Sequence, residues 1–193
     1  MAVRIDELDP SSDQDVRAAA GLMTMAWRIA LLDDTEPEYP LEDVTGVLLD
    51  VAAPGDRAGW LAHEGDRAVA LCTVVAPEGA AHVIVHELWV LPSHRRHGIG
   101  RSLAEHAIAF ARTHGRAVVR GSHYEGAPAS IAFAASLGAA PAGRTEQLRR
   151  RGDENQVLEA WDDGTNAAVT ERLRAERYRP VAVWRDVELR IAP

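Results

Sequence analysis

The sequence pattern of residues 82–114 predicts a strand, a turn and a helix, and this segment constrains the fold more than any other. The strand, His82–Val90 (HVIVHELWV), is rich in β-branched and apolar residues. The helix, Gly98–His114, carries apolar residues at helical spacing, and Gly115 follows where helices commonly end. A strand that leads through a tight turn into an amphipathic helix predicts an α/β fold with the helix covering one face of a sheet.

The turn between strand and helix has the composition of an anion-binding site. Its sequence from Arg95 to Arg101 is RRHGIGR, with glycines at 98 and 100. The first N–H groups of a helix have no intrahelical partner, and glycine lets the backbone approach a bulky anion closely. The helix dipole adds about half a positive charge at that end. The pattern therefore predicts a seat for a pyrophosphate.

Two other phosphate-binding motifs are excluded by detail. A Rossmann fingerprint needs G-x-G-x-x-G and an acidic residue about 20 residues later, but only one G-x-G is present. A Walker A motif needs a lysine, and all 21 residues counted as lysine or arginine are arginines. The absence of lysine also excludes Schiff-base chemistry.

Charge and cysteine content limit the partners. The net charge of −8 argues against nucleic acid as the main partner, so positive charge for an anionic ligand must be concentrated locally. Cys72 is the single cysteine, which excludes an intrachain disulfide, and no apolar run reaches the length of a membrane span. We expect a cytoplasmic protein without a membrane partner, and no metal site, since His94 and His97 belong to the pyrophosphate turn.

The remaining elements alternate between strands and helices. The expected strands are Val3–Leu8, Trp60–His63, Arg67–Val75, Ala117–Gly121, Arg144–Arg151, Gln156–Trp161 and Val181–Ile191. The expected helices are one that follows a Ser12/Asp15 capping box, then Leu41–Val51, Pro128–Leu137 and Asn166–Tyr178. This order favours an α/β sandwich built on a mixed sheet with flanking helices.

The R-x-x-G-x-G of Arg95, Gly98 and Gly100, preceded by Val90-Leu91-Pro92, resembles the cofactor motif of the GNAT superfamily of acetyl-CoA-dependent N-acetyltransferases. The resemblance is strong over residues 82–138 and looser from Val3 to Trp161. It implies a GNAT-type mixed β-sheet flanked by helices over residues 1–161. Residues 162–193 would then be a C-terminal helix-strand extension that covers a sheet edge or forms a homodimer.

The resemblance also implies where acetyl-CoA binds. The sheet would splay after the strand that ends near Val90, and the backbone N–H of Val90 would polarise the thioester carbonyl. Backbone amides from Arg96 to Arg101 would hold the pyrophosphate. The implied cofactor-binding residues are Leu88, Trp89, Val90, Arg95, Arg96, His97, Gly98, Ile99, Gly100 and Arg101.

An amine acceptor needs a base, because a primary amine of pKa about 10 is mostly protonated at pH 7. Glu87 is the first candidate, since several family members place a carboxylate near the split and strand alternation is expected to break there. His86 and His123 are alternatives, and His123 follows the next parallel strand, where it could lie close to Glu87. Each of these residues is also compatible with a purely structural role, as a solvated or salt-bridged glutamate or as a structural histidine at a strand end.

The chain departs from the family pattern where a proton donor is expected. The family often carries a tyrosine within F-Y-x-x-x-G-F, but the matching segment here, Phe133–Ala139, has Ala134 at that position. The asparagine often found at the start of this helix falls on Ala127. Two hypotheses follow: an acetyltransferase that moves an acetyl or short acyl group to a small-molecule or peptide amine, or an acyl-CoA-binding module with little or no catalysis. The acidic stretch from Asp33 to Asp43 is expected near the acceptor.

Overall fold

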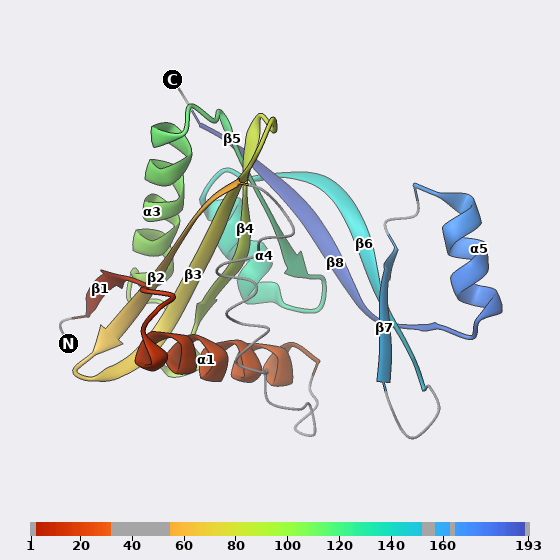
Figure 1. The fold of residues 1–193 in the computed structure, drawn as a ribbon, viewed down its shortest axis with the longest axis horizontal. Coiled ribbons are helices and arrows are strands. Elements are labelled where there is room, and N and C mark those ends of the chain that lie inside the picture. The colour runs from red at the N-terminus through yellow and green to blue at the C-terminus, as the bar shows by residue number, and fades with distance from the viewer. Residues whose placement is uncertain (1–2, 32–54, 152–156, 163–164, 192–193) are drawn as a thin grey trace. The chain divides into compact units, whose positions relative to one another are not determined.

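The computed structural model describes residues 3–31, 55–151, 157–162 and 165–191 (Figure 1). The chain divides into two compact units. The first unit comprises residues 1–121 and 190–193, and the second comprises residues 122–189. These units are groups of residues that contact one another more than they contact the rest of the chain. They differ from the predicted domains, 1–161 and 162–193, and the predicted boundary after Trp161 stays a prediction.

The sheet of the first unit is mixed, as predicted. Strands β1 (Arg4–Glu7), β2 (Gly55–Glu64), β3 (Arg67–Pro77) and β4 (His82–Val90) pair in this order, each antiparallel to its neighbour. Strand β5 (Val118–Tyr124) begins in this unit and runs parallel to β4. β3 is buried over most of its length, which makes it the centre of the unit.

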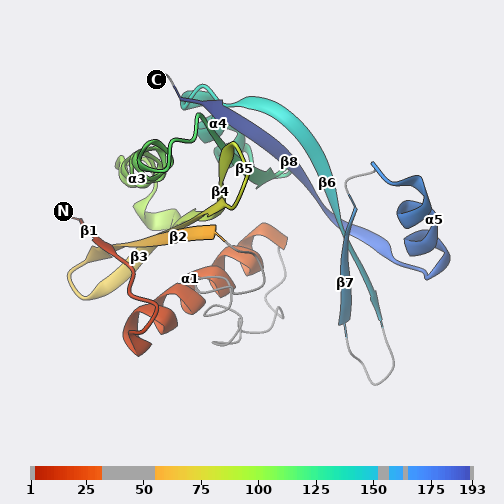
Figure 2. The same ribbon diagram turned by 45° about the horizontal axis from the view of Figure 1, so that its top comes forward.

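Two helices cover opposite faces of β2, β3 and β4: α1 (Asp13–Leu31) and α3 (Ile99–Thr113) (Figure 2). The indole ring of Trp60 on β2 lies 5.3 Å from the ring of His106 and 6.4 Å from that of Phe110, both on α3. The core consists of aliphatic residues from the sheet and both helices. Its most buried members include Leu61, Val69, Leu71, Val74, Val83 and Leu103.

The start of α1 is closed by side chains of the chain itself. Ser12 Oγ accepts a hydrogen bond from the Asp15 amide at 3.3 Å, which confirms the capping role predicted for Ser12. Asp15 does not return a bond to Ser12, because its carboxylate accepts from the Asp9 amide at 3.0 Å. The helix therefore begins with half of a capping box and an acidic first turn.

The second unit contains helices α4 (Pro128–Ser136) and α5 (Ala167–Ala175) and strands β6 (Ala140–Arg151), β7 (Val157–Asp162) and β8 (Arg179–Arg190). β6 pairs with both β7 and β8 in antiparallel fashion, and α5 lies beside β7 (Figure 1). The two strands predicted on either side of residues 152–153 pair with each other, and the helix and strand predicted after Trp161 are confirmed as elements. The predicted turn itself lies outside the described residues.

Four sequence-based expectations differ from the structure or lie outside the described residues. β2 begins at Gly55 instead of Trp60, and β5 extends to Tyr124, so His123 lies inside the strand and not after it. The helix expected at 41–51 and the acidic stretch from Asp33 to Asp43 lie outside the described residues. No helix in the described part of the chain is both long and apolar enough to cross a bilayer.

Candidate active site

Strands β4 and β5 pair over only a short stretch. Their parallel register runs from His82 opposite Val118 to Ile84 opposite Arg120, whereas β4 continues to Val90. The second half of β4 thus extends beyond this pairing. The structure agrees with the splayed sheet that the sequence resemblance implied.

A β-bulge interrupts β4 in the same region. Glu87 lies opposite Thr73 and Val85 lies opposite Val74, so His86 is the extra residue of β4. A bulge bends a strand, strengthens its twist and re-aims the side chains beside it. The expected break in strand alternation near the split is therefore present, and it lies directly before Glu87.

The backbone of Val90 is directed away from β3. The N–H of Leu91 donates to the carbonyl oxygen of Val69 on β3 at 2.9 Å. Successive residues of a strand direct their N–H groups to opposite sides, so the amide of Val90 points toward the other edge of β4. The Val90 carbonyl oxygen, on that same side, accepts a hydrogen bond from Arg95 Nε at 3.0 Å.

Arg95 fixes the turn onto the end of the strand. Besides its bond to Val90, its guanidinium carbon lies 4.8 Å from the centre of the Trp89 ring, a cation–π geometry. A single 3-10 turn, Pro92–His94, precedes it, with His94 N–H bonded to the Leu91 carbonyl at 2.8 Å. This structural role for Arg95 is additional to the predicted one, and its contact with the cofactor stays a prediction.

A buried histidine anchors the turn to the β2–β3 hairpin. His94, only 8% exposed, places Nε2 3.0 Å from a carboxylate oxygen of Glu64 and Nδ1 2.8 Å from Ser93 Oγ. The sequence interpretation missed this pair. Glu64 and His94 are 30 residues apart, and no local pattern connects a hairpin glutamate to a histidine in a distant turn.

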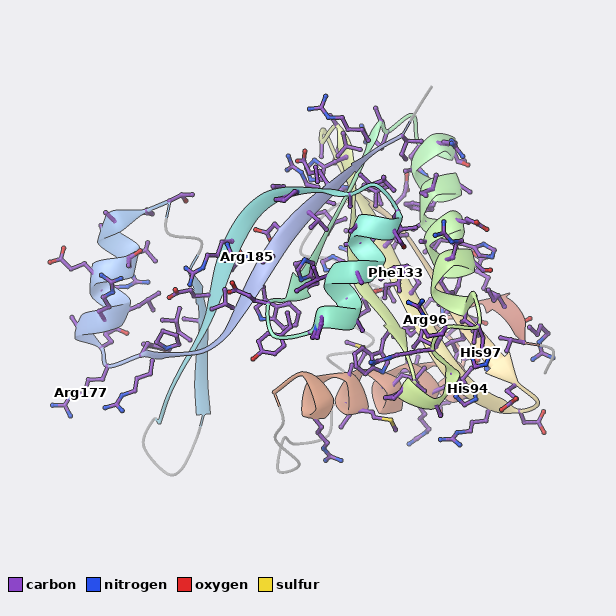
Figure 3. The ribbon with its side chains drawn as sticks, turned by 180° about the vertical axis from the view of Figure 1, so that it is seen from behind. His94, Arg96, His97, Phe133, Arg177 and Arg185 are labelled. Carbon is purple, nitrogen blue, oxygen red and sulfur yellow. The ribbon has the colours of Figure 1, made fainter. Side chains whose placement is uncertain are left out.

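The start of α3 carries no side-chain cap. Its N-cap is Gly98, at φ 85, and the first intrahelical bond of the helix runs from the Ser102 amide to the Gly98 carbonyl at 3.0 Å. The amides of residues 99–101 therefore precede the intrahelical ladder. Arg96 also has a positive φ, 68°, and its side chain and that of His97 are exposed at this turn (Figure 3).

This turn has the features of an anion-binding site, and pyrophosphate binding there stays a prediction. A Cβ built on Gly98 would meet nothing within 4 Å, so no described part of the chain packs against this glycine. Consecutive backbone amides near left-handed residues form concave anion sites, and the helix dipole favours negative charge there. Exposed Arg96 and His97 add the local basic character that an acidic protein needs.

Glu87 has an unusually basic carboxylate. The residue is half-buried, and burial raises the pKa of its carboxyl to about 7. Removal of a charged group from water disfavours ionisation, and no hydrogen bond among the described residues offsets this effect at Glu87. A carboxyl of this pKa can accept a proton near neutral pH and release it again.

Cys72 is unsuited to covalent catalysis. It is fully buried on β3, and burial, with a smaller contribution from the charge of Glu87, raises the pKa of its thiol to about 12. The thiolate is the nucleophilic form of cysteine, and it is not populated at neutral pH under these conditions.

Comparison with known proteins is consistent with this geometry. The family model described as "Acetyltransferase (GNAT) family" matches residues 22–139, more than half of the chain. The chain belongs to the acetyltransferase (GNAT) family. Acetyl-CoA is the acyl donor of this family, so the uncapped turn before α3 is its expected binding element.

Solved structures share the GNAT fold at low sequence identity. A tandem GNAT protein from the clavulanic acid biosynthesis pathway, determined without acetyl-CoA, has a TM-score of 0.81 and 16% identity, covering 100% of this chain and 99% of that chain. The ribosomal-protein-S18-alanine N-acetyltransferase from Escherichia coli has a TM-score of 0.59 and 15% identity, with coverages of 100% and 96%.

A chain of the NatC complex, bound to Gag peptide and CoA, has a TM-score of 0.62 and 11% identity, with 100% coverage of both chains. A search of curated proteins found no match to the sequence. At these identities the structural neighbours establish the fold of this GNAT protein and nothing narrower.

The second unit holds the other residues that the GNAT pattern singled out. His123 on β5 has Nδ1 3.3 Å from the carbonyl oxygen of Tyr124, and its proximity to Glu87 stays a prediction, because the two lie in different units. Ala134 lies within α4, where the family tyrosine is expected. Ala127 is the N-cap of α4, and no side chain caps that helix.

Proposed function

We propose that this GNAT protein is an N-acetyltransferase that moves an acetyl or short acyl group from acetyl-CoA to a primary amine of a small molecule or peptide. The observation that carries the proposal is the arrangement along one continuous segment. A half-buried carboxyl at Glu87, an outward-directed amide at Val90 and uncapped helical amides after Gly98 follow one another within 15 residues (87 to 101).

In this proposal the turn before α3 binds the pyrophosphate of acetyl-CoA, and the end of β4 polarises its thioester carbonyl. The amides from Arg96 to Arg101 hold the pyrophosphate, and Leu88 and Trp89 line the donor side of β4. The Val90 N–H donates to the thioester oxygen, where negative charge develops during attack. A donor preset at such a position is typically worth about 2.7–4 kcal/mol.

Glu87 would serve as the general base. Deprotonating an alkyl ammonium of pKa about 10 at pH 7 costs about 4 kcal/mol, and a carboxyl of pKa about 7 can take that proton reversibly. The free amine then attacks the carbonyl carbon: the C–N bond forms and the C–S bond breaks. The second proton of the nitrogen passes to the departing thiolate, which gives the amide and CoA. His123 remains the alternative base.

Two features support direct transfer without an acid at the tyrosine position. The thiol of CoA has a pKa of about 8.5, so its thiolate is a tolerable leaving group even with Ala134 in place of tyrosine. The buried thiol of Cys72 offers no covalent intermediate. A ternary complex is therefore the proposed arrangement. Two of the structural neighbours, the S18-alanine acetyltransferase and the peptide-bound NatC complex, suggest peptide amino groups as a first class of acceptor.

Two assays on the full chain test the proposal. Thermal unfolding with and without acetyl-CoA should show a rise in melting temperature, because a ligand at 100 times its dissociation constant adds about 2.7 kcal/mol. CoA release would then be followed with a thiol reagent against primary alkylamines, an aromatic amine and peptides with free N-termini. Reactions without acceptor provide the background hydrolysis rate.

The outcomes separate the two hypotheses. Stabilisation together with amine-dependent CoA release supports the transferase. Stabilisation without release on any amine favours the acyl-CoA-binding module, which Ala134 and Ala127 motivate. Absence of any stabilisation by acetyl-CoA would contradict both.

A further inference from the structure

The contact between Glu64 and His94 joins the turn before α3 to a part of the sheet that is distant in sequence. Nε2 of His94 lies 3.0 Å from a carboxylate oxygen of Glu64, at the end of β2, and Nδ1 lies 2.8 Å from Ser93 Oγ. A carboxylate only accepts hydrogen bonds, so Nε2 is the donor in this pair. Both ring nitrogens of this buried histidine have partners, which fixes the orientation of the ring.

Stability alone gives a weak account of this contact. The second carboxylate oxygen of Glu64, Oε1, is buried and has no hydrogen-bond partner within the described part of the chain. A buried polar atom without a partner has a desolvation cost, which offsets the gain from the oxygen that is bonded. Buried charged groups of this kind are therefore poor evidence of stabilisation, and in some proteins their role is to select one conformation.

The segment that follows His94 needs such a selection. Arg96 and Gly98 have positive φ values, 68° and 85°. Glycine adopts this conformation freely, but an arginine there is strained and persists only where the surrounding structure holds it. His94, Arg96 and His97 follow one another at this turn, beside the start of α3 (Figure 3). The anchored histidine thus directly precedes the strained part of the turn.

The contacts that hold this turn differ in what they fix. Arg95 Nε bonds to the carbonyl oxygen of Val90, a partner in the same short segment. The bond between His94 and Glu64 instead reaches from the turn to the β2–β3 hairpin. Its loss would leave residues 95–98 attached to the end of β4 but without this connection to the rest of the sheet.

We propose that Glu64 and His94 are positioning residues for acetyl-CoA, because their contact holds the turn in the conformation whose amides bind the pyrophosphate. The inference rests on the proposed function. Without the contact the turn would be in its binding conformation for only part of the time, and the apparent Kd rises by the inverse of that fraction. A turn that keeps this conformation for a tenth of the time binds about tenfold more weakly.

The sign of the effect separates this role from simple electrostatics. The carboxylate of Glu64 carries negative charge beside a turn that is proposed to bind an anion. By Coulomb's law alone, removal of that charge would strengthen the binding of acetyl-CoA. A positioning role predicts the opposite, namely weaker binding. Asp66, exposed in the turn of the same hairpin, provides the matched control for the loss of charge.

Isothermal titration of the full chain measures this effect. In Glu64→Ala the Kd of acetyl-CoA should rise about tenfold, whereas in Asp66→Ala it should stay unchanged or fall. Glu64→Gln should keep the Kd of the unsubstituted protein, because an amide oxygen also accepts from Nε2. The effects of Glu64→Ala and His94→Ala should not add in the double variant, because both remove the same contact. In steady-state assays of Glu64→Ala, the KM for acetyl-CoA should rise while kcat stays unchanged.

A second measurement does not depend on the folding of a variant. Coupling between two sites is reciprocal, so bound acetyl-CoA should strengthen the contact between His94 and Glu64. In the unsubstituted protein, the Nε2 proton of His94, followed by nitrogen-15 NMR, should exchange with water several-fold more slowly at saturating acetyl-CoA. An unchanged exchange rate, or a Kd in folded Glu64→Ala no higher than that of the unsubstituted protein, would overturn the inference.

The same experiments separate this inference from the proposed function. Turnover of an amine by the unsubstituted protein, with an equal Kd in Glu64→Ala, removes the positioning role and leaves the transferase. Weaker binding in Glu64→Ala without turnover of any amine by either protein supports the positioning role, and it overturns the transferase in favour of the acyl-CoA-binding module. Absence of acetyl-CoA binding by the unsubstituted protein overturns both.

Discussion

The two helix starts of the first unit have opposite electrostatic and hydrogen-bonding characters. At α1, Ser12 caps the helix, Asp15 accepts from the Asp9 backbone and the first turn is acidic. At α3, glycine occupies the N-cap, no side chain caps the helix and the preceding turn is basic. Where stability alone is required, the chain satisfies its own amides. At the start of α3, where the cofactor site is proposed, no side chain caps these amides.

The carboxyl groups of the two regions show the same contrast. Hydrogen bonds from the side chain and backbone of Ser11 lower the pKa of exposed Asp9, whereas burial raises the pKa of Glu87 to about 7. The first carboxylate is stabilised in its charged form by neighbouring donors. The second is kept near the balance point of protonation, as proton transfer requires. The contrast supports the proposal that residues 87–101 carry the chemistry, whereas the contacts of residues 4–16 serve the fold.

Among the substitutions that test this comparison, Glu87→Gln should have the largest effect, and that effect is on kcat. Loss of a general base lowers kcat by about 10²- to 10⁴-fold, while the KM for acetyl-CoA should stay unchanged. The unsubstituted enzyme should lose activity as pH falls through about 7, because protonated Glu87 cannot accept a proton, and the variant should lack this dependence. Steady-state rates from pH 5.5 to 9 test this. Glu105→Gln, at an exposed position on α3, is the matched control.

Glu87 also makes a prediction for stability that needs no acceptor. A carboxyl whose pKa is raised on folding binds its proton more tightly in the native state, so it lowers the stability of the protein as pH rises from about 4.5 to about 7. Glu87→Gln removes that penalty. Urea unfolding at pH 5 and pH 8 should show the variant gaining on the unsubstituted protein at the higher pH. An equal difference at both pH values would contradict a raised pKa.

Gly98→Asp should make the start of α3 resemble that of α1. A carboxylate at the N-cap competes with the pyrophosphate for the first amides and repels its charge. The loss of charge-assisted hydrogen bonds, about 3 kcal/mol, raises the Kd of acetyl-CoA about 100-fold. Isothermal titration measures the Kd. Gly79→Asp is the control, since Gly79 also has a positive φ, 72°, and open space around it. A similar loss of affinity in both variants would refute a local effect.

Local sequence pattern was sufficient for the segment that carries the proposed chemistry. β4 has the predicted bounds, His82–Val90, and α3 differs from its predicted range by one residue at each end. The reason is that alternation, glycine and helical periodicity act over a few residues and agree with one another here. The break in alternation before Glu87 was likewise expected, and the bulge at His86 provides it.

Contacts between distant residues could not be predicted in this way. The Glu64–His94 pair and the register that brings Thr73 opposite Glu87 depend on how strands align, which no single segment encodes. β6 begins at Ala140, earlier than predicted, because the Ala-Pro-Ala-Gly sequence has no alternation and is recruited by its pairing with β8. Tertiary context decides such cases.

Ser12→Ala should show that the cap of α1 serves stability alone. Loss of an N-cap hydroxyl costs about 1 kcal/mol, measured as a lower free energy of unfolding in urea. The Kd of acetyl-CoA should be unchanged in the folded variant. Ser11→Ala is the matched control, because the Ser11 hydroxyl bonds to Asp9 and caps no helical amide, so its loss should cost less. A weaker Kd in Ser12→Ala would break the division between the two regions.

Ala127→Asn tests the comparison at a third helix start, with the smallest expected effect. α4 begins without a side-chain cap, as α3 does, but Pro128 follows at its first position and no basic residue lies in its first turn. An asparagine at Ala127 can accept from the amide of Ala129, and the gain in the free energy of unfolding should be about 0.5 kcal/mol. Ala129→Asn, inside the helix, should not stabilise, because asparagine there has no free amide to cap.

If Ala127→Asn stabilises and leaves the Kd of acetyl-CoA unchanged, the absence of a cap is not sufficient for a ligand site. The glycine and the arginines before α3 would then be the residues that make a ligand site there. If it weakens acetyl-CoA binding, the amides of α4 also contact the cofactor, and the contrast between α1 and α3 would have to include a second binding helix.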